Sequence, residues 1–270
     1  MTARHLTEAV SDVVSTKVSA RPHEEKIAEA LKEVVFMGDS PVFDQPLIIL
    51  AFVNRCGSNL LAEHLRQIPG IGGFQESLNW DTVTRQSSLL ELESLQDYLS
   101  SIVSRRGGEL GFGVKASGEQ IAMLARWNIF AMFPAVKIIH IRREDLIAQA
   151  VSLHFALQTG QWTSQQSITQ SGTDPIEYDF QSLLSKFDAI IKSNELIDRV
   201  CSASGFPRQT VIYEQLVSQP EKVLADLGSF LNLPPEFTLP KKETVLQKQT
   251  SPEKTEITNQ FRADLAEWLF

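Results

Sequence analysis

Residues 46–65, PLIILAFVNRCGSNLLAEHL, contain a strand, a tight turn and a helix in immediate succession. Residues 47–53 form a continuous apolar run, which is typical of a short strand buried on both faces. Leu60, Leu61 and Leu65 then recur at helical spacing. A strand that leads through a tight turn into a helix is the opening unit of a parallel sheet, so the sequence predicts an α/β fold.

The rest of the chain continues the alternation of strands and helices. We expect further strands at 111–115, 135–141 and 210–213, and helices at 89–105, 144–158, 180–203 and 220–231. Together these elements predict one domain over residues 45–270, built as a P-loop-like parallel sheet flanked by helices.

Residues 1–44 precede this pattern and are expected to form an N-terminal helical extension. Residues 21–35 read as a helix, with Ile27, Leu31 and Val34 on one apolar face. Such a helix either packs on the main domain or serves as a dimerisation or partner helix. The sequence leaves both open, and with them a homodimer.

Composition and charge narrow the function classes. The chain has 270 residues, of which 43% are hydrophobic and 21% charged, as in ordinary globular proteins. Its formal net charge of −8 makes it a poor candidate for nucleic-acid binding or for an anionic membrane surface. Any anionic ligand must therefore meet a local basic pocket.

Cysteine, histidine and hydropathy patterns point to a metal-free cytoplasmic protein. The two cysteines, Cys56 and Cys201, form no metal or redox motif, and the five histidines form no zinc-binding pair. Residues 1–20 are polar and lack the apolar core of a signal peptide. No apolar run approaches the ~18 residues of a membrane helix.

The turn from Asn54 to Asn59 has the chemistry of an anion site. Gly57 allows a tight backbone, and the following helix offers free N–H groups at the positive end of its dipole. Arg55 and Ser58 add side-chain donors at the same end. The lysine of a Walker A loop is absent, and a simple connection between strand and helix is the alternative.

A second basic group follows the strand expected at 135–141. Arg142 and Arg143 stand at its carboxyl end, where open α/β sheets bind ligands, and Ser152 lies farther along the next helix. Arginine donors suit a phosphate dianion. The alternative is that the two arginines pair with Glu144 and Asp145 on the surface.

The turn resembles the 5′-phosphosulfate loop of sulfotransferases. Arg55, Gly57 and Ser58, followed by Asn59-Leu60-Leu61, are similar to the R-S-G-S-T-L-L of the bacterial carbohydrate type typified by trehalose 2-sulfotransferase. Cys56 and Asn59 stand where that family commonly has Ser and Thr. The resemblance implies that Arg55, Cys56, Gly57, Ser58 and Asn59 bind the donor 3′-phosphoadenosine 5′-phosphosulfate (PAPS).

Three further segments extend the resemblance to about residues 47–262. Residues 140–152 and 158–162 are similar to the family segment that holds the 3′-phosphate, which implies roles for Arg142, Arg143 and Ser152. Tyr213, at the start of a Y-E-Q-L segment, would lie against the adenine, with packing at a strand end as the alternative. Residues 246–250 echo a segment that closes over the 3′-phosphate, which implies a role for Lys248.

The resemblance also implies which residues carry the chemistry. Glu76, in a Gln-Glu pair after the first helix, corresponds to a catalytic glutamate and would act as general base. Arg55 would neutralise charge on the phosphosulfate, and Lys115 at the end of a strand would point into the same crevice. A surface position is the alternative for Glu76 and for Lys115, while His64 and His154 are alternative bases.

The sequence is therefore interpreted as a PAPS-dependent sulfotransferase acting on a hydroxyl of a carbohydrate or glycolipid-like acceptor, without a metal. A nucleotide-dependent phosphotransferase is the alternative among enzymes. A nucleotide-binding scaffold without catalytic activity is the other alternative. The identity of the acceptor is beyond the sequence.

Overall fold

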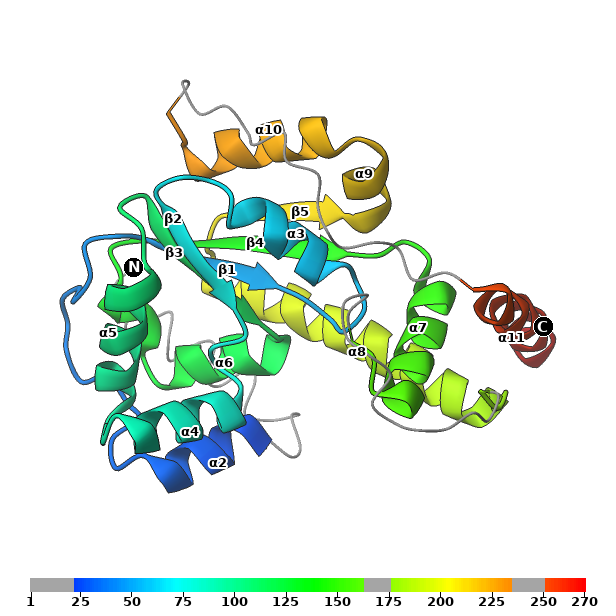
Figure 1. Ribbon diagram of the computed structural model, residues 1–270, viewed down its shortest axis with the longest axis horizontal. Helices are drawn as coiled ribbons and strands as arrows, with labels where there is room; N and C mark the ends of the chain where they lie inside the picture. Colours follow the sequence, from blue (N-terminus) through cyan, green and yellow to red (C-terminus); the bar gives the residue numbers. More distant parts are fainter. Residues whose placement is uncertain (1–21, 163–175, 235–250) are drawn as a thin grey trace.

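The computed structural model describes residues 22–162, 176–234 and 251–270. Its centre is a five-stranded, fully parallel sheet in the order β2-β3-β1-β4-β5 (Figure 1). The strands are β1 (Leu47–Ala51), β2 (Ile71–Gln75), β3 (Gly111–Ala116), β4 (Val136–Arg142) and β5 (Arg208–Ile212). The predicted α/β class, a parallel sheet flanked by helices, is confirmed.

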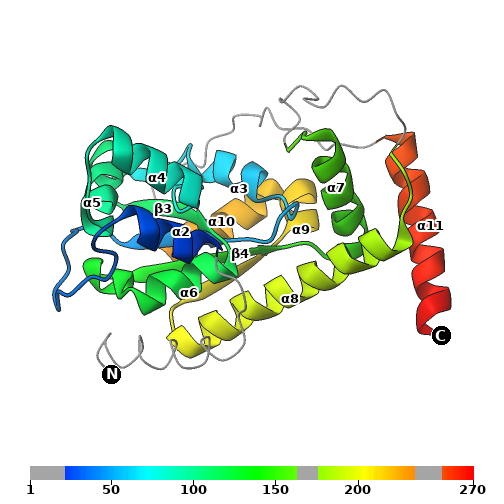
Figure 2. The ribbon, with the colours of Figure 1, turned by 90° about the horizontal axis from the view of Figure 1, so that it is seen from below.

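Helices cover both faces of the sheet, as Figures 1 and 2 show. They are α2 (Pro22–Ala30), α3 (Ser58–Leu65), α4 (Trp80–Leu89), α5 (Leu95–Arg106), α6 (Gly118–Arg126), the 3₁₀ helix η1 (Ile129–Met132), α7 (Leu146–Thr159), α8 (Phe180–Ser204), α9 (Tyr213–Ser218), α10 (Pro220–Leu231) and α11 (Pro252–Leu269).

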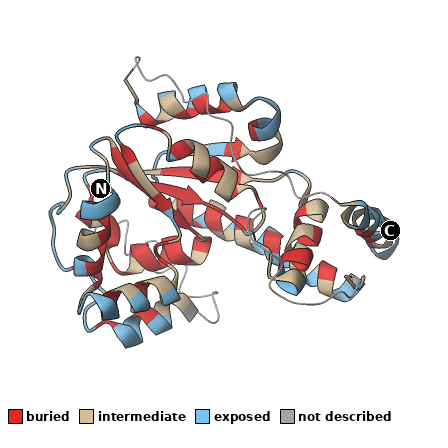
Figure 3. Ribbon diagram, in the orientation of Figure 1, coloured by how far each residue is buried: buried red, intermediate tan, exposed pale blue. Residues whose placement is uncertain are grey.

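Strand β1 separates two apolar cores, because its side chains alternate between the two faces of the sheet. Leu47, Ile49 and Ala51 belong to the core shared with α2, α5, α6 and α8. Ile48 and Leu50 belong to the core shared with α3, α9 and α10. All five side chains are buried, and Figure 3 shows the sheet as the buried centre of the molecule. Burial on both faces explains the unbroken apolar run.

Strand β2 was not predicted, because its sequence IGGFQ lacks an apolar run. A Cβ atom on Gly72 would lie 1.9 Å from the carbonyl oxygen of Arg106. A Cβ atom on Gly73, whose φ is +92°, would lie 2.1 Å from that of Gly113. The close approach of neighbouring backbone therefore requires glycine at the positions where a typical strand would show apolar side chains.

The helix predicted over 89–105 begins later than expected. Ser94 caps α5, since its hydroxyl accepts a hydrogen bond from the backbone N–H of Asp97 at 3.0 Å. Glu91, with a φ of +53°, lies in the break that separates α4 from α5. Helix α6 was not predicted, although a complete capping box starts it at Ser117.

Helix α2 packs on the domain, against α4 and α6 (Figure 2). Ile27 and Leu31 are buried in the same core as β1, and the carboxylate of Glu24 pairs with the guanidinium of Arg126. The described part of the extension thus follows the first of the two alternatives, a helix packed on the main domain. The division at residue 44 stays a prediction.

Within the three described ranges, no helix combines the length and the apolar character needed to cross a membrane.

A cluster of charges joins β4, β5 and α8. The carboxylate of Asp198 on α8 accepts hydrogen bonds from Arg142 at 3.0 Å and from Arg208 at 2.7 Å, and lies 3.7 Å from Nδ1 of His140. The His140 side chain is fully buried. Burial, together with the positive charge of Arg142, lowers the pKa of His140 to about 4, although Asp198 acts to raise it.

We predict that His140 makes the fold sensitive to acid. Its pKa falls from 6.5 to about 4 on folding, so the unfolded chain binds the proton first as the pH drops. The stabilisation is complete above pH 6.5 and is lost as the pH falls towards 4, which amounts to about 2 kcal/mol between pH 7.5 and pH 5. Urea unfolding of wild type and of His140→Gln at both pH values measures it. An equal loss in both proteins would contradict the prediction.

Candidate functional site

The predicted site residues lie at one edge of the sheet, because parallel strands end at the same edge. Glu76 directly follows β2, Lys115 is the penultimate residue of β3, and Arg55 lies in the turn after β1. Arg143 directly follows β4, and Tyr213 directly follows β5. Each strand therefore contributes one side chain to this edge, in the order of the sheet.

The turn between β1 and α3 is shaped by left-handed backbone. Arg55 has a φ of +66° and Gly57 a φ of +93°. A Cβ atom on Gly57 would lie 2.2 Å from the ring of Tyr213, so only glycine lets this ring pack on the turn. Gly57 also leaves the first N–H groups of α3 without a side-chain cap, as an anion site requires.

Side chains in the same turn differ in their exposure. Cys56 is buried, and burial raises the pKa of its thiol, so that it stays protonated and packs as a small apolar group. Ser58 is buried at the start of α3, and Asn59 is half-buried. The structure therefore gives Cys56 a packing role in the loop and leaves the polar contacts to its neighbours.

Helix α7 holds the turn from one side. The Gln149 side chain donates a hydrogen bond to the carbonyl oxygen of Asn54 at 2.8 Å. One turn later, the Ser152 hydroxyl accepts a hydrogen bond from Nε of Arg55 at 3.0 Å. The Arg55 guanidinium also donates to the carbonyl oxygen of Trp162. The guanidinium and the backbone before it are thus fixed together, which pre-organises the turn.

The two adjacent arginines point to different partners. Arg142 pairs with Asp198 in the cluster behind β4. Arg143 lies over the ring of Tyr213, 5.2 Å from its centroid, with Nε 3.7 Å from the carboxylate of Glu214. Glu214 also accepts the backbone N–H groups of residues 144 and 145. Only Arg143 therefore lies beside the turn that carries Arg55.

Lys254, near the start of α11, joins this basic group, and sequence reasoning missed it. Its ammonium lies 5.1 Å from the centroid of the Phe155 ring, one helical turn beyond Ser152 on the same face of α7. Burial lowers the pKa of Lys254 to about 8, and the charges of Arg55 and Arg143 contribute. The Ser-Pro-Glu-Lys start of α11 indicates a helix but carries no ligand motif.

Lys115 connects the turn after β1 to the predicted base. Its side chain is only 3% exposed, so the alternative of a surface lysine is excluded. The ammonium donates hydrogen bonds to Oδ1 of Asn59 at 2.5 Å and to Oε1 of Glu76 at 2.6 Å, and it lies 4.6 Å from the centroid of the Phe52 ring. A buried lysine needs such partners, because an unpaired charge in the interior is costly.

Glu76 is ionised in this arrangement. Burial acts to raise the pKa of its carboxyl, but the charge and hydrogen bond of Lys115 and the hydrogen bond from Asn79 outweigh it and hold the pKa below the usual range. The Glu76 side chain remains 41% exposed. A carboxylate that is fixed on one side and accessible on the other can accept a proton from a bound hydroxyl.

The two histidines named as alternative bases lie elsewhere. Nε2 of His154 is within hydrogen-bonding distance of the carbonyl oxygen of Glu177 and of the Gln158 side chain, and the residue is buried. His64 lies near the end of α3, and burial lowers its pKa. Among the contacts of the described residues, neither histidine forms a hydrogen bond or ion pair with Arg55, Lys115 or Glu76.

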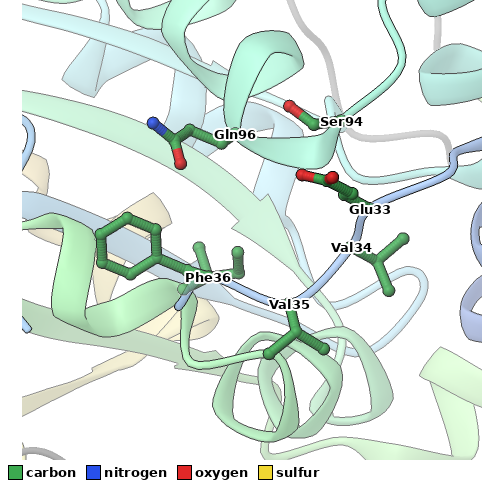
Figure 4. Close-up of a pocket in the computed structure, with 7 residues that line it drawn as sticks. Glu33, Val34, Val35, Phe36, Ser94 and Gln96 are labelled. Carbon is green, nitrogen blue, oxygen red and sulfur yellow. The ribbon is translucent and has the colours of Figure 1, made fainter. Parts of the chain in front are cut away.

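The described residues include no group of three His, Cys, Asp or Glu side chains arranged to hold a metal ion. A small cavity of about 20 Å³ lies between the segment after α2 and the start of α5 (Figure 4). It has room for about one water molecule, and its lining residues do not include Arg55, Arg143 or Lys254. Lys248 lies outside the described residues.

Comparison with known protein families shows to which family the chain belongs. The family model described as Stf0 sulphotransferase matches residues 118–264, which is more than half of the chain. The chain belongs to this sulfotransferase family. The matched range includes Arg142, Arg143, Ser152, Tyr213 and Lys254, whereas the turn at Arg55 and the candidate base lie before it. No curated protein matches the sequence.

A solved sulfotransferase shares the fold, and two further solved sulfotransferases are more distantly similar. A sulfotransferase from Alicyclobacillus acidocaldarius superposes with a TM-score of 0.51 at 15% sequence identity, covering 83% of this chain and 94% of that one. The sulfotransferase domain of the Synechococcus PCC 7002 olefin synthase gives 0.46 at 16% identity, covering 84% and 98%. A mouse sulfotransferase complexed with PAP gives 0.42 at 12% identity, covering 82% and 66%.

We predict that the affinity of this sulfotransferase family member for adenosine 3′,5′-bisphosphate falls as the pH rises through 8. The Lys254 ammonium, with a pKa of about 8, is charged below that pH and neutral above it. Calorimetric titration at pH 7.5 and 9 should show a several-fold loss, at most about tenfold.

Two lysine variants test this prediction, one at Lys254 and one at Lys222 as the matched control. Lys254→Arg keeps its charge at both pH values and should abolish the loss of affinity, whereas Lys222→Arg, on the exposed face of α10, should leave it unchanged. An equal loss in wild type and in Lys254→Arg would remove Lys254 from the anion site.

Proposed function

We propose that the protein transfers a sulfuryl group from PAPS to a hydroxyl of a carbohydrate or glycolipid-like acceptor. The observation that carries the proposal is the gathering of Arg55, Arg143 and Lys254 around the turn after β1, in a chain whose formal net charge is −8. Besides burial, the charge of Arg143 lowers the pKa of Arg55, and the charges of both arginines lower the pKa of Lys254. A bound polyanion would relieve this repulsion.

The donor is proposed to lie across the carboxyl ends of β1, β4 and β5. The turn of Arg55 and Gly57, with the N–H groups of α3, would receive the 5′-phosphosulfate. Arg143, Ser152 and Lys254 would receive the 3′-phosphate, and Lys248 remains a prediction for the same group. The hydroxyl of Ser152 accepts from Arg55 and keeps its own proton to donate to a phosphate oxygen.

Tyr213 is proposed to contact the adenine, since its ring already packs between Gly57 and Arg143. Arg142 is assigned a structural role instead, because it pairs with Asp198 at the opposite face of β4. The Asn59 amide, whose oxygen is taken by Lys115, keeps its N–H₂ group for the donor.

The reaction forms a bond between the acceptor oxygen and sulfur and breaks the bond from sulfur to the bridging oxygen of the phosphosulfate. Negative charge then develops on the departing 5′-phosphate, where Arg55 and Lys115 can neutralise it. The acceptor proton passes to the carboxylate of Glu76. The products are the sulfate ester and adenosine 3′,5′-bisphosphate, and the proton released completes the balance.

The carbohydrate or glycolipid-like acceptor follows from the resemblance of the Gln75-Glu76 segment and of the turn to the trehalose 2-sulfotransferase type. The test is transfer of ³⁵S from labelled PAPS to a panel of sugars and glycolipid head groups, with Arg55→Ala as the matched inactive variant. Transfer by wild type alone supports the proposal. Binding of the bisphosphate without transfer to any acceptor favours the inactive scaffold, and binding of ATP instead favours the phosphotransferase.

We predict that adenosine 3′,5′-bisphosphate binds far more tightly than AMP, because the Arg143 group has no ligand without a 3′-phosphate. Loss of one charged donor to a phosphate costs roughly 1.5–3 kcal/mol, or about ten- to a hundredfold in affinity. Calorimetry should show this loss for Arg143→Ala. Arg142→Ala is the matched neighbour and should bind both nucleotides as wild type does. Equal affinity of wild type for the two nucleotides would contradict the donor assignment.

We predict that Glu76→Gln lowers turnover about 10²–10⁴-fold, because the amide keeps the shape of the carboxylate but cannot take up the acceptor proton. The affinity for adenosine 3′,5′-bisphosphate should change little, since the donor contacts lie elsewhere. Steady-state turnover with the acceptor found in the screen, together with calorimetry, measures both quantities.

Two results would count against this role of Glu76. A fall in turnover below about threefold would make it a bystander, and a large loss of nucleotide affinity would give it a binding role. Because Glu76 is the partner of the buried Lys115, urea unfolding must accompany the assay.

A further inference from the structure

Asn79 stands at the N-cap of α4 but does not cap it. Asparagine at this position usually accepts a hydrogen bond from the first turn of the helix, which stabilises the helix by about 1 kcal/mol. Here the Asn79 side chain makes no such bond. Its two polar groups instead bind the side chains of Glu76 and Gln120, so the helix does not gain this stabilisation from Asn79.

The orientation of the Asn79 amide is fixed by α6. Oδ1 accepts a hydrogen bond from Nε2 of Gln120 at 3.0 Å. Gln120 is buried, and its own oxygen accepts the backbone N–H of Ser117 at 2.9 Å in the capping box of α6. Because these bonds determine which end of each amide is the donor, Nδ2 of Asn79 must face Glu76, where it donates to Oε2 at 3.1 Å.

Helix α2 supplies the side chain that caps the start of α4 in place of Asn79. Nδ1 of His23 accepts the backbone N–H of Trp80, the first residue of α4, at 3.2 Å. The ammonium of Lys26 lies 3.7 Å from the centroid of the Trp80 ring. Burial lowers the pKa of His23, so its ring is neutral at pH 7 and Nδ1 is free to accept. Residues of α2 therefore stabilise the start of α4, while the Asn79 side chain donates its hydrogen bond to Glu76.

We propose that Asn79 is a positioning residue that orients the Glu76 carboxylate for proton transfer. Lys115 holds Oε1 at 2.6 Å and Asn79 holds Oε2 at 3.1 Å, so both oxygens are fixed and the plane of the carboxylate is determined. Gln120 acts through Asn79, and α2 acts through the start of α4. This proposal rests on the proposed function for the role of Glu76 as base.

The test is a pH titration of the protein with ¹³C-labelled glutamate side chains, followed by NMR, with the Glu76 signal assigned by its absence in Glu76→Gln. A hydrogen bond to the ionised carboxylate lowers its pKa, so Asn79→Ala should move the titration of Glu76 to higher pH. Asn79→Asp should move it further, because a second negative charge then faces Glu76. Ser88→Ala, at an exposed position of the same helix, is the matched control and should leave it unchanged.

The urea unfolding midpoint, compared with turnover, separates a positioning role of Asn79 from a purely structural one. Asp is a good N-cap and is favoured at the start of a helix, which offsets part of its repulsion from Glu76, so Asn79→Asp should unfold in urea at a midpoint above that of Asn79→Ala. With the acceptor found in the screen, both Asn79 variants should lose roughly ten- to a hundredfold in turnover while their affinity for adenosine 3′,5′-bisphosphate is unchanged. An unchanged Glu76 titration in both variants would overturn the proposal.

Failure of the proposed function would look different. In that case wild type itself neither binds the bisphosphate nor transfers sulfate, whatever the titration of Glu76 shows. If wild type is active and the Asn79 variants keep full turnover, only the positioning role is wrong.

Discussion

The site depends on one geometric constraint, which is that five parallel strands end at the same edge of one sheet. Each strand delivers one functional group there, so the order of the strands sets the order of the groups. Glu76 and Lys115 come from the neighbouring strands β2 and β3, while Arg143 and Tyr213 come from β4 and β5. The turn after the central strand β1 lies between them. The proposed base and the proposed nucleotide-binding groups are thereby separated along the edge, with Arg55 between them.

The two halves of this edge of the sheet differ in how their charged side chains are arranged. The buried ammonium of Lys115 is compensated by Glu76 and Asn59, so that half of the edge is stable without a ligand. Burial and the charge of Arg143 lower the pKa of Arg55, and burial and the charges of both arginines lower the pKa of Lys254. The carboxylate of Glu214 near Arg143 also accepts two backbone N–H groups. The mutual repulsion of these three cations therefore destabilises the region where a polyanion is proposed to bind. Such local destabilisation is common at functional sites.

The sequence predicted the parts of the fold and site that have a local signal. The apolar run of β1 and the turn around Gly57 follow from residue types alone, and the predicted turn, Glu76 and Lys115 do meet at one edge. Strand β2 has no such signal, because close backbone contacts require Gly72 and Gly73. Lys254 was missed because its proximity to the other cations depends on the packing of α11 against α7.

The two arginines show why tertiary structure is needed to finish the assignment. Arg142 ends β4 and Arg143 follows it, so the pleat turns them to opposite faces. Apolar residues occupy both faces of the strand, with Ile138 in one core and Ile139 in the other, so the pattern does not reveal which face meets the turn. Asp198, distant in sequence on α8, pairs with Arg142 at one face. The position of that single carboxylate leaves Arg143 as the arginine assigned to the anion that we propose to bind beside Arg55.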